Sequence, residues 1–112
     1  MEKTIFQKII DREIPAKIEY EDEDVIVIHD IHPKAPVHLL VIPKKMIPTV
    51  MDATEVDEEL MGKLIFTAKN VAKKLGLSGY KLLFNVGKEG GQVVPHVHLH
   101  LLGGGRVDIS QM

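Results

Sequence analysis

Cysteine is absent from all 112 residues of the chain. Its absence excludes disulfide bonds, thiolate nucleophiles and zinc sites that use cysteine, and it fits a reducing compartment. Long apolar runs are absent too, because no uninterrupted segment reaches the length of a secretion signal or a membrane-spanning helix. From these two absences we expect a cytoplasmic protein without a membrane partner.

The chain also lacks a large excess of charge of either sign. The chain carries 14 lysines and arginines against 16 aspartates and glutamates, a formal net charge of -2, with no block of five like charges. Such a balance argues against duplex nucleic acid as a partner, whereas it leaves single nucleotides open as ligands. The length and the 45% hydrophobic content predict one globular domain over residues 1–112.

Two helices and about five strands are expected from the spacing of apolar residues. A short helix follows the capping residue Thr4, and a long one follows a capping box formed by Asp52 and Glu55 and ends at Gly76. The buried stripe predicted for the long helix comprises Val56, Leu60, Met61, Leu64, Ile65, Ala68, Val71, Ala72 and Leu75. Strands are predicted at 18–20, 25–29, 37–42, 80–86 and 96–102.

These elements predict an α+β fold in which the long helix covers one side of an antiparallel sheet. A glycine-rich hairpin loop at 87–92 leads into the last strand, and its backbone amides could approach an anion. Because such a sheet retains an open edge, we expect a two-fold homodimer to complete it.

Three of the six histidines alternate with apolar residues near the C-terminus. His96, His98 and His100 would share one face of a strand, about 6 to 7 Å apart, while Val97 and Leu101 enter the core. Packing alone gives no reason for three imidazoles in register. The row therefore predicts a functional site.

Two kinds of chemistry suit the row. Two of its histidines together with His38 or His32 could bind zinc, since imidazole is a common zinc ligand. Alternatively, one imidazole could attack phosphorus while its neighbours set its tautomer and move protons, and Asn85 and loop amides stabilise the phosphoryl oxygens. Both readings stay open on the residues alone.

Several motifs carry a resemblance to a known family. The segment 96–102 has the pattern His-φ-His-φ-His-φ-φ, where φ is apolar, and further matches are Ile-His-Asp-Ile at 28–31, Pro-Lys-Ala-Pro-Val-His at 33–38, Val-Ile-Pro-Lys-Lys at 41–45 and Gly-Gly-Gln at 90–92. From about residue 4 to 104, with a short tail at 105–112, the chain resembles the histidine triad (HIT) family in its Hint branch. The resemblance implies a HIT-like fold and a homodimeric hydrolase. Such an enzyme binds purine nucleoside monophosphates and cleaves nucleoside phosphoramidates or aminoacyl adenylates without a metal or other cofactor.

The same resemblance implies the roles of individual residues. His98 would be the nucleophile that forms a nucleotidyl-histidine intermediate, His100 would contact the phosphate or leaving group, and His38 and His96 would complete the histidine network. Asp30 would bind the ribose through hydrogen bonds that its carboxylate accepts. The other implied nucleotide contacts are Asn85, Gln92 and Val93 at the phosphate and Ile5, Phe6, Ile9, Ile28 and Ile31 around the base.

Three positions depart from the family pattern. Val93 stands where a serine hydroxyl is common, Pro95 where tyrosine is common, and His32 where serine is common. Loss of one hydrogen bond to a charged group costs on the order of 1.5 to 3 kcal/mol, which tunes a rate without abolishing a mechanism. Besides the hydrolase, a zinc-binding protein using two triad histidines and His38, and a non-catalytic purine nucleotide-binding module, remain alternatives.

Overall fold

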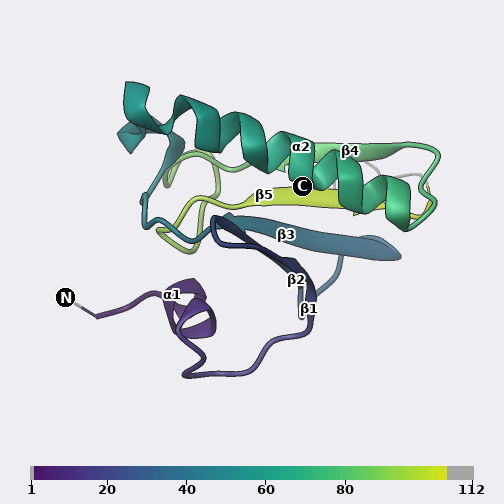
Figure 1. The fold of residues 1–112 in the computed structure, drawn as a ribbon, viewed down its shortest axis with the longest axis horizontal. Coiled ribbons are helices and arrows are strands. Elements are labelled where there is room, and N and C mark those ends of the chain that lie inside the picture. Colours follow the sequence, from purple (N-terminus) through teal and green to yellow (C-terminus); the bar gives the residue numbers. More distant parts are fainter. Residues whose placement is uncertain (1, 106–112) are drawn as a thin grey trace.

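A computed structural model describes residues 2–105 of the chain. Five antiparallel strands form one sheet in the order β1-β2-β3-β5-β4, and a helix lies on each side of it (Figure 1). The elements are α1 (Ile5–Ile10), β1 (Ile18–Glu21), β2 (Val25–His29), β3 (Val37–Pro43), two short 3-10 helices η1 (Val50–Asp52) and η2 (Glu55–Asp57), α2 (Glu58–Lys74), β4 (Tyr80–Phe84) and β5 (Leu99–Gly103). The predicted α+β class is confirmed.

Helix α1 begins as the sequence predicts. The Thr4 hydroxyl accepts a hydrogen bond from the Gln7 backbone N–H (3.1 Å), and the Gln7 side chain accepts one from the Thr4 N–H (2.8 Å). This capping box satisfies two N–H groups that the helix itself cannot pair. The helix packs its buried face on one side of the sheet, in a cluster made of Phe6, Ile9, Ile26, Ile28, Leu40 and Ile42.

The start of the long helix differs from the prediction. Helix α2 begins at Glu58, six positions after Asp52, because the Asp52 carboxylate turns back to accept hydrogen bonds from the N–H and hydroxyl of Thr49. A local side-chain-to-backbone bond of this kind competes with helix formation. Val56 consequently lies in η2 and is 82% exposed.

The predicted buried stripe of α2 is confirmed only in part. Leu64, Ala68, Val71 and Ala72 are buried against the sheet, whereas Val56, Ile65 and Leu75 are exposed. The helix ends as predicted at Gly76, whose φ of 73° is the left-handed conformation that glycine adopts without strain. The Leu77 N–H then bonds the Ala72 carbonyl (3.0 Å), which closes the last turn.

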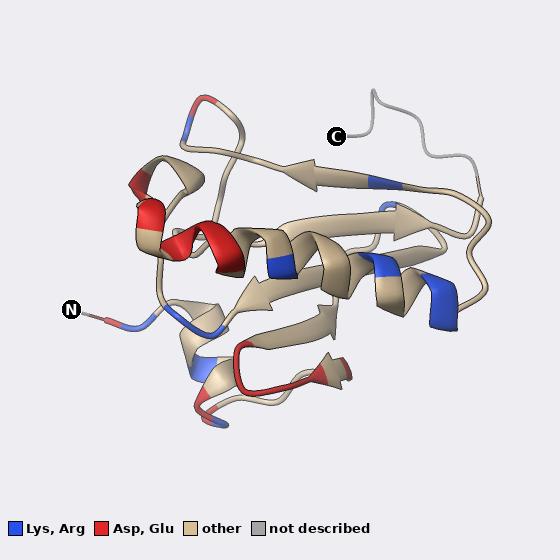
Figure 2. Cartoon of the chain, turned by 45° about the horizontal axis from the view of Figure 1, so that its top comes forward, with Lys and Arg blue, Asp and Glu red and all other residues tan. Residues whose placement is uncertain are grey.

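The charged residues at the two ends of α2 interact favourably with the helix dipole. Glu58 and Glu59 lie in the first turn and Lys73 and Lys74 in the last, and Figure 2 shows the acidic and basic ends of this helix. Each such charge stabilises a helix by a few tenths of a kcal/mol. No helix among the described residues has the length and apolar character needed to cross a bilayer.

The two final strands are shorter than predicted. Strand β4 ends at Phe84, and β5 begins at Leu99 although the histidine row starts at His96. Before β5 the chain bends, and the Val97 N–H bonds the Ile47 carbonyl (2.8 Å), which lies outside the sheet. The alternation nevertheless holds, since Val97, Leu99 and Leu101 all enter the core beneath α2.

Candidate active site

Pairing of β3 with β5 brings together histidines that lie 62 positions apart in the sequence. In the register of these strands Leu40 lies opposite His100 and His38 opposite Leu102, so His38 and His100 share the sheet face turned away from α2. Their ring centroids are 5.2 Å apart, and those of His98 and His100 are 5.0 Å apart. The Asp30 N–H bonds the His38 carbonyl (3.0 Å), which holds Asp30 beside the cluster.

A chain of hydrogen bonds assigns the protons of His38 and His100. The Lys34 backbone N–H donates to His38 Nδ1 (3.0 Å), so this nitrogen must be an acceptor and the proton of a neutral ring lies on Nε2. His38 Nε2 is 2.9 Å from His100 Nδ1 and 3.5 Å from the Asp30 carboxylate. His100 therefore accepts at Nδ1 and carries its own proton on Nε2, which makes Nε2 a donor.

The opposite tautomer follows for His98. Its Nδ1 lies 2.8 Å from the backbone carbonyl of His96, and because a carbonyl only accepts, Nδ1 carries the proton. The Nε2 lone pair of a neutral His98 is then free, and it makes no hydrogen bond within residues 2–105. The Phe6 ring packs edge-on against this imidazole, with ring centroids 4.9 Å apart.

His96 differs from the other two members of the row. Its ring is fully buried, and its Nε2 donates to the Pro43 carbonyl (2.7 Å), while its Nδ1 has no partner among the described residues. The ring does not reach the cavity that holds His98 and His100. Its backbone carbonyl, rather than its imidazole, is the group that belongs to the histidine network.

All four imidazoles are held neutral. Burial lowers the pKa of His38, His96 and His98 below the ordinary value of 6.5. Burial lowers the pKa of His100 most strongly, to about 4, and the neighbouring His98 and His38 add to the effect. Loss of hydration penalises the charged form of each ring. Around neutral pH the cluster therefore offers one free lone pair, on His98, and one ring N–H donor, on His100.

A cavity of about 430 Å³ opens over His98 and His100. Of the residues predicted to bind a nucleotide, those that line it are Ile5, Phe6, Ile9, Ile28, Asp30, Ile31, Asn85 and Val93, together with His38, His98 and His100. Its wall is apolar on the α1 side. The volume falls in the range of small-molecule sites. Three of its lining residues, Asp30, His38 and His100, hold their polar atoms within 4.8 Å of one another.

Gln92 is the second predicted site residue that the structure places outside the cavity. Its side-chain oxygen accepts from the Gly87 N–H (2.9 Å), and its amide nitrogen donates to the Pro48 and Val94 carbonyls. The side chain thus ties the glycine-rich loop to the rest of the fold. Asn85 does line the cavity and donates to the Gly90 carbonyl (2.8 Å), which braces the same loop.

Sequence reasoning missed several lining residues. Leu40 shares its strand face with His38, so alternation along the strand could have placed it there. Val94, Gly91 and Lys34 lie in irregular segments, where no periodicity signals their direction. His29 and His32 also line the cavity, and His29 Nε2 lies 2.9 Å from the Glu19 carboxylate.

The residues suited to metal binding differ from the predicted set. Within residues 2–105, one group could hold an ion, namely Asp30, His38 and His100, whose ligand atoms all lie within 4.8 Å of one another. It contains one triad histidine where the zinc hypothesis used two. Both nitrogens of His38 already have partners, Lys34 N–H and His100, so an ion would have to replace those hydrogen bonds.

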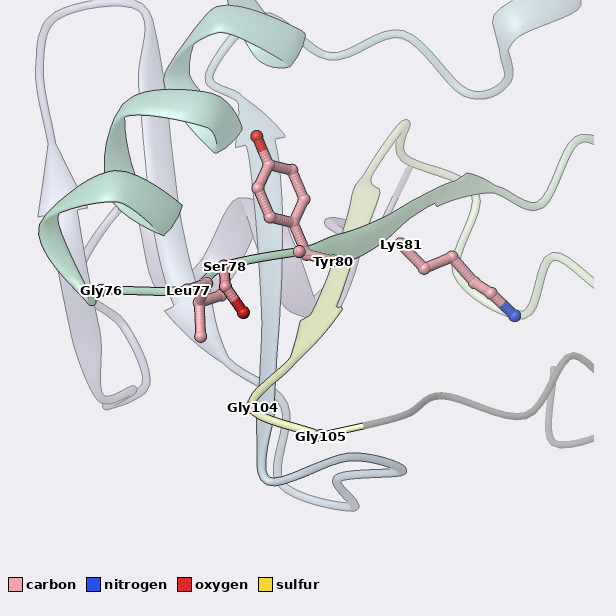
Figure 3. Close-up of a pocket in the computed structure, with 8 residues that line it drawn as sticks. Gly76, Leu77, Ser78, Tyr80, Lys81, Gly104 and Gly105 are labelled. Carbon is pink, nitrogen blue, oxygen red and sulfur yellow. The ribbon is translucent and has the colours of Figure 1, made fainter.

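A larger hollow of about 760 Å³ lies between the end of α2 and the start of β4. Figure 3 shows that Tyr80 and Lys81, which follow one another on β4, extend in different directions. Most of its remaining lining is glycine, as at Gly76, Gly79 and Gly104. Its described lining includes neither a histidine nor a carboxylate.

Comparisons with known proteins agree on one family. The model of the HIT domain matches residues 11–107. The chain is 48% identical over 105 residues, 92% of this chain and 88% of the relative, to the purine nucleoside phosphoramidase of Escherichia coli (strain K12). It is 51% identical over 104 residues, 92% of this chain and 91% of the relative, to an uncharacterized HIT-like protein of Synechococcus elongatus.

Solved structures give the same result. A HIT family hydrolase from Legionella pneumophila superposes with a TM-score of 0.93 at 46% identity, covering 98% of this chain and 100% of that one. A histidine triad nucleotide-binding protein from Candida albicans superposes with a TM-score of 0.81 at 31% identity, covering 93% of this chain and 81% of that one.

Proposed function

The chain belongs to the HIT domain family, and from that premise we propose that it is a purine nucleotide-binding hydrolase whose nucleophile is His98. Its substrates in this proposal are nucleoside phosphoramidates or aminoacyl adenylates, which contain a P–N bond or a mixed anhydride. The E. coli relative is a purine nucleoside phosphoramidase, which supports this substrate class.

The observation that carries the proposal is the hydrogen bond between His98 Nδ1 and the His96 carbonyl (2.8 Å). It fixes the tautomer whose Nε2 lone pair is free, in a ring whose pKa burial lowers, so that the nucleophile is neutral without a separate base. The neighbouring ring of His100 has the complementary tautomer and presents a proton at Nε2.

Two steps follow for a phosphoramidate. His98 Nε2 attacks phosphorus, the P–N bond breaks, and the leaving nitrogen takes a proton from a water molecule to which His100 Nε2–H donates a hydrogen bond. This step leaves a nucleotidyl group on His98 and a hydroxide ion beside it. The hydroxide then attacks phosphorus, the P–Nε2 bond breaks, and the Nε2 lone pair of His98 is restored, while His100 keeps its proton throughout. For an aminoacyl adenylate the leaving group is a carboxylate, which departs without needing a proton.

The nucleotide would lie along the cavity from its apolar end to the histidines. Ile5, Phe6, Ile9, Ile28 and Ile31 offer the apolar contacts that a purine base needs. One Asp30 oxygen accepts from the His32 N–H (2.7 Å), and the carboxylate retains lone pairs that can accept from ribose hydroxyls. Asn85 and Val93 would lie near the phosphate, whereas Gln92 would act by holding the loop.

The test is to detect the intermediate. Adenosine 5'-phosphoramidate is mixed with the protein, the reaction is quenched, and the peptide containing His98 is analysed by mass spectrometry for a nucleotidyl group. The variant His98→Ala should lose the adduct and turnover yet bind AMP, and His29→Ala is the matched control for loss of a histidine that lines the same cavity. Turnover by His98→Ala at the wild-type rate contradicts the proposal.

A zinc protein is the second candidate, because Asp30, His38 and His100 present ligand atoms within 4.8 Å of one another. Protein purified without metal-affinity resin is assayed for zinc, and activity is measured before and after a chelator. Stoichiometric zinc, with turnover lost on chelation, would favour this candidate over the histidine nucleophile.

A third candidate is a non-catalytic binding module. Tight AMP binding without hydrolysis of either substrate class would favour it.

The proposal includes a homodimer. Strand β4 forms one edge of the sheet, and α2 leaves Ile65 and Phe66 exposed at 46% and 62%. Burying apolar side chains of this size is a usual driving force for association. Sedimentation analysis should give a dimer for the natural chain and a monomer for Phe66→Glu, and a monomeric natural chain would contradict this part of the proposal.

A further inference from the structure

We propose that Lys34 recognises a second negative charge on the substrate, beyond the one on the reacting phosphorus group. This inference rests on the proposed function, and it assigns to the chain a preference within the nucleotide class. The charge could belong to the leaving group or to a phosphate on the ribose, and both are anions that an ammonium group binds in the same way.

Lys34 is the one lysine or arginine among the described residues that line the cavity. Its side chain is exposed, and it makes no ion pair within residues 2–105, whereas Lys3, Lys44, Lys45 and Lys63 each pair with a carboxylate. An ammonium with no carboxylate partner keeps its capacity to bind an anion from solution. The Lys34 backbone meanwhile donates to His38, so the stem of this side chain is anchored at the histidine cluster.

The position of the charge favours a group other than the reacting phosphate. The Lys34 backbone N–H lies 3.0 Å from His38 Nδ1, and His38 Nε2 lies 2.9 Å from His100 Nδ1, so Lys34 adjoins the cluster through His38. The hydrogen bond of the His98 ring within residues 2–105 is instead to the His96 carbonyl. The main chain of Lys34 is therefore held at His38 rather than at His98, and from there its side chain serves a substituent other than the group that His98 would attack.

The carboxylate and the exposed apolar side chains of the cavity are not suited to bind a second anionic group of the substrate. Asp30 is the one carboxylate in the described lining, and its own charge repels an anion, so it suits hydroxyl groups. Ile31 and Val93, which line the same cavity and are 81% and 89% exposed, are apolar. Among these neighbours, an acidic substituent of the substrate would find its cation at Lys34.

Nucleotide binding provides the direct test. Dissociation constants are measured by calorimetry for AMP, for ADP, whose second phosphate occupies the leaving-group position, and for adenosine 3',5'-bisphosphate, which carries its second phosphate on the ribose. The natural chain is compared with Lys34→Gln and Lys34→Glu, and with Lys73→Glu as a charge-matched control on the exposed end of α2.

The expected result is a change in the preference for one of the doubly phosphorylated nucleotides over AMP. Lys34→Gln should reduce that preference about three- to tenfold, as for a partly exposed ion pair, and Lys34→Glu should reduce it further. Lys73→Glu should leave it unchanged. The nucleotide that responds, ADP or the bisphosphate, identifies where the second charge lies.

Two failures are distinguishable. If AMP binds and both preferences stay within twofold in Lys34→Gln and Lys34→Glu, the inference about Lys34 is overturned while the proposed function stands. If the natural chain binds none of the three nucleotides, the proposed function fails, and the role of Lys34 fails with it.

Discussion

The histidine cluster should make the stability of the chain depend on pH, and His100 should contribute most to this dependence. In the folded chain the pKa of His100 is about 4, against an ordinary value of 6.5. Below pH 6.5 the unfolded chain binds a proton at this residue and the folded chain does not. The free energy of unfolding therefore falls as the pH drops from 6.5 toward 4, and below 4 the loss is complete.

The size of the effect follows from that pKa difference. Each pKa unit corresponds to about 1.4 kcal/mol, so His100 alone should remove on the order of 2 to 3 kcal/mol of stability between pH 7.5 and pH 4.5. In a chain of this length that loss lowers the melting temperature by about 10 °C. His38, His96 and His98 change stability in the same direction, because their pKa values are also lowered.

The variant His100→Asn isolates the contribution of this ring. Its side-chain oxygen can take the place of Nδ1 and accept from His38 Nε2, while the titrating imidazole is lost. Urea unfolding of both chains, at one protein concentration from pH 4.5 to 7.5, should show a shallower decline for the variant. His32→Asn controls for removal of an exposed histidine. Parallel curves for His100→Asn and the natural chain would refute the reasoning.

Three further predictions concern turnover and the core. Hydrolysis of adenosine phosphoramidate should be independent of pH around neutrality and fall only below pH 6.5, because burial lowers the pKa of the His98 nucleophile; a decline that starts above pH 7 would contradict this. Leu101→Ala should cost about 2 to 5 kcal/mol in urea unfolding, since Leu101 is fully buried between sheet and α2, and a cost below 1 kcal/mol would be inconsistent with that packing. Val93→Ser should change relative rates for different leaving groups by about tenfold without altering stability, as Val93 is 89% exposed at the cavity, and equal rate ratios would exclude a role for this position.

Local patterns predicted the elements well where a single interaction decides them. The Thr4 cap, the Gly76 terminus and the burial of Val97 and Leu101 each depend on neighbours within a few positions, and all are confirmed. The start of α2 was predicted wrongly because Asp52 could bond either forward or back. Its actual partner, Thr49, forms an equally good local motif three positions earlier.

Site geometry depended on contacts that no local pattern contains. Alternation gives His96 and His100 the same direction along the chain, yet their partners are the Pro43 carbonyl and His38, which other parts of the fold supply. Gln92 belongs to a recognisable motif, but its side chain binds Gly87 and two carbonyls instead of facing the cavity. Direction along a strand is thus predictable, whereas the choice of partner requires the tertiary structure.

The histidine cluster lowers the stability of the folded chain, and this loss of stability supports a catalytic role for the cluster. Four imidazoles are packed in surroundings that lower their pKa values, and His96 Nδ1 is buried without a partner, a state that costs on the order of 1 to 3 kcal/mol. An apolar side chain at position 96 would avoid that cost and could fill the same space. The Pro43 contact, however, fixes the backbone whose carbonyl orients His98. The His96 ring lowers stability on burial and does not line the cavity. It thus acts on the proposed nucleophile, His98, through the backbone carbonyl of His96.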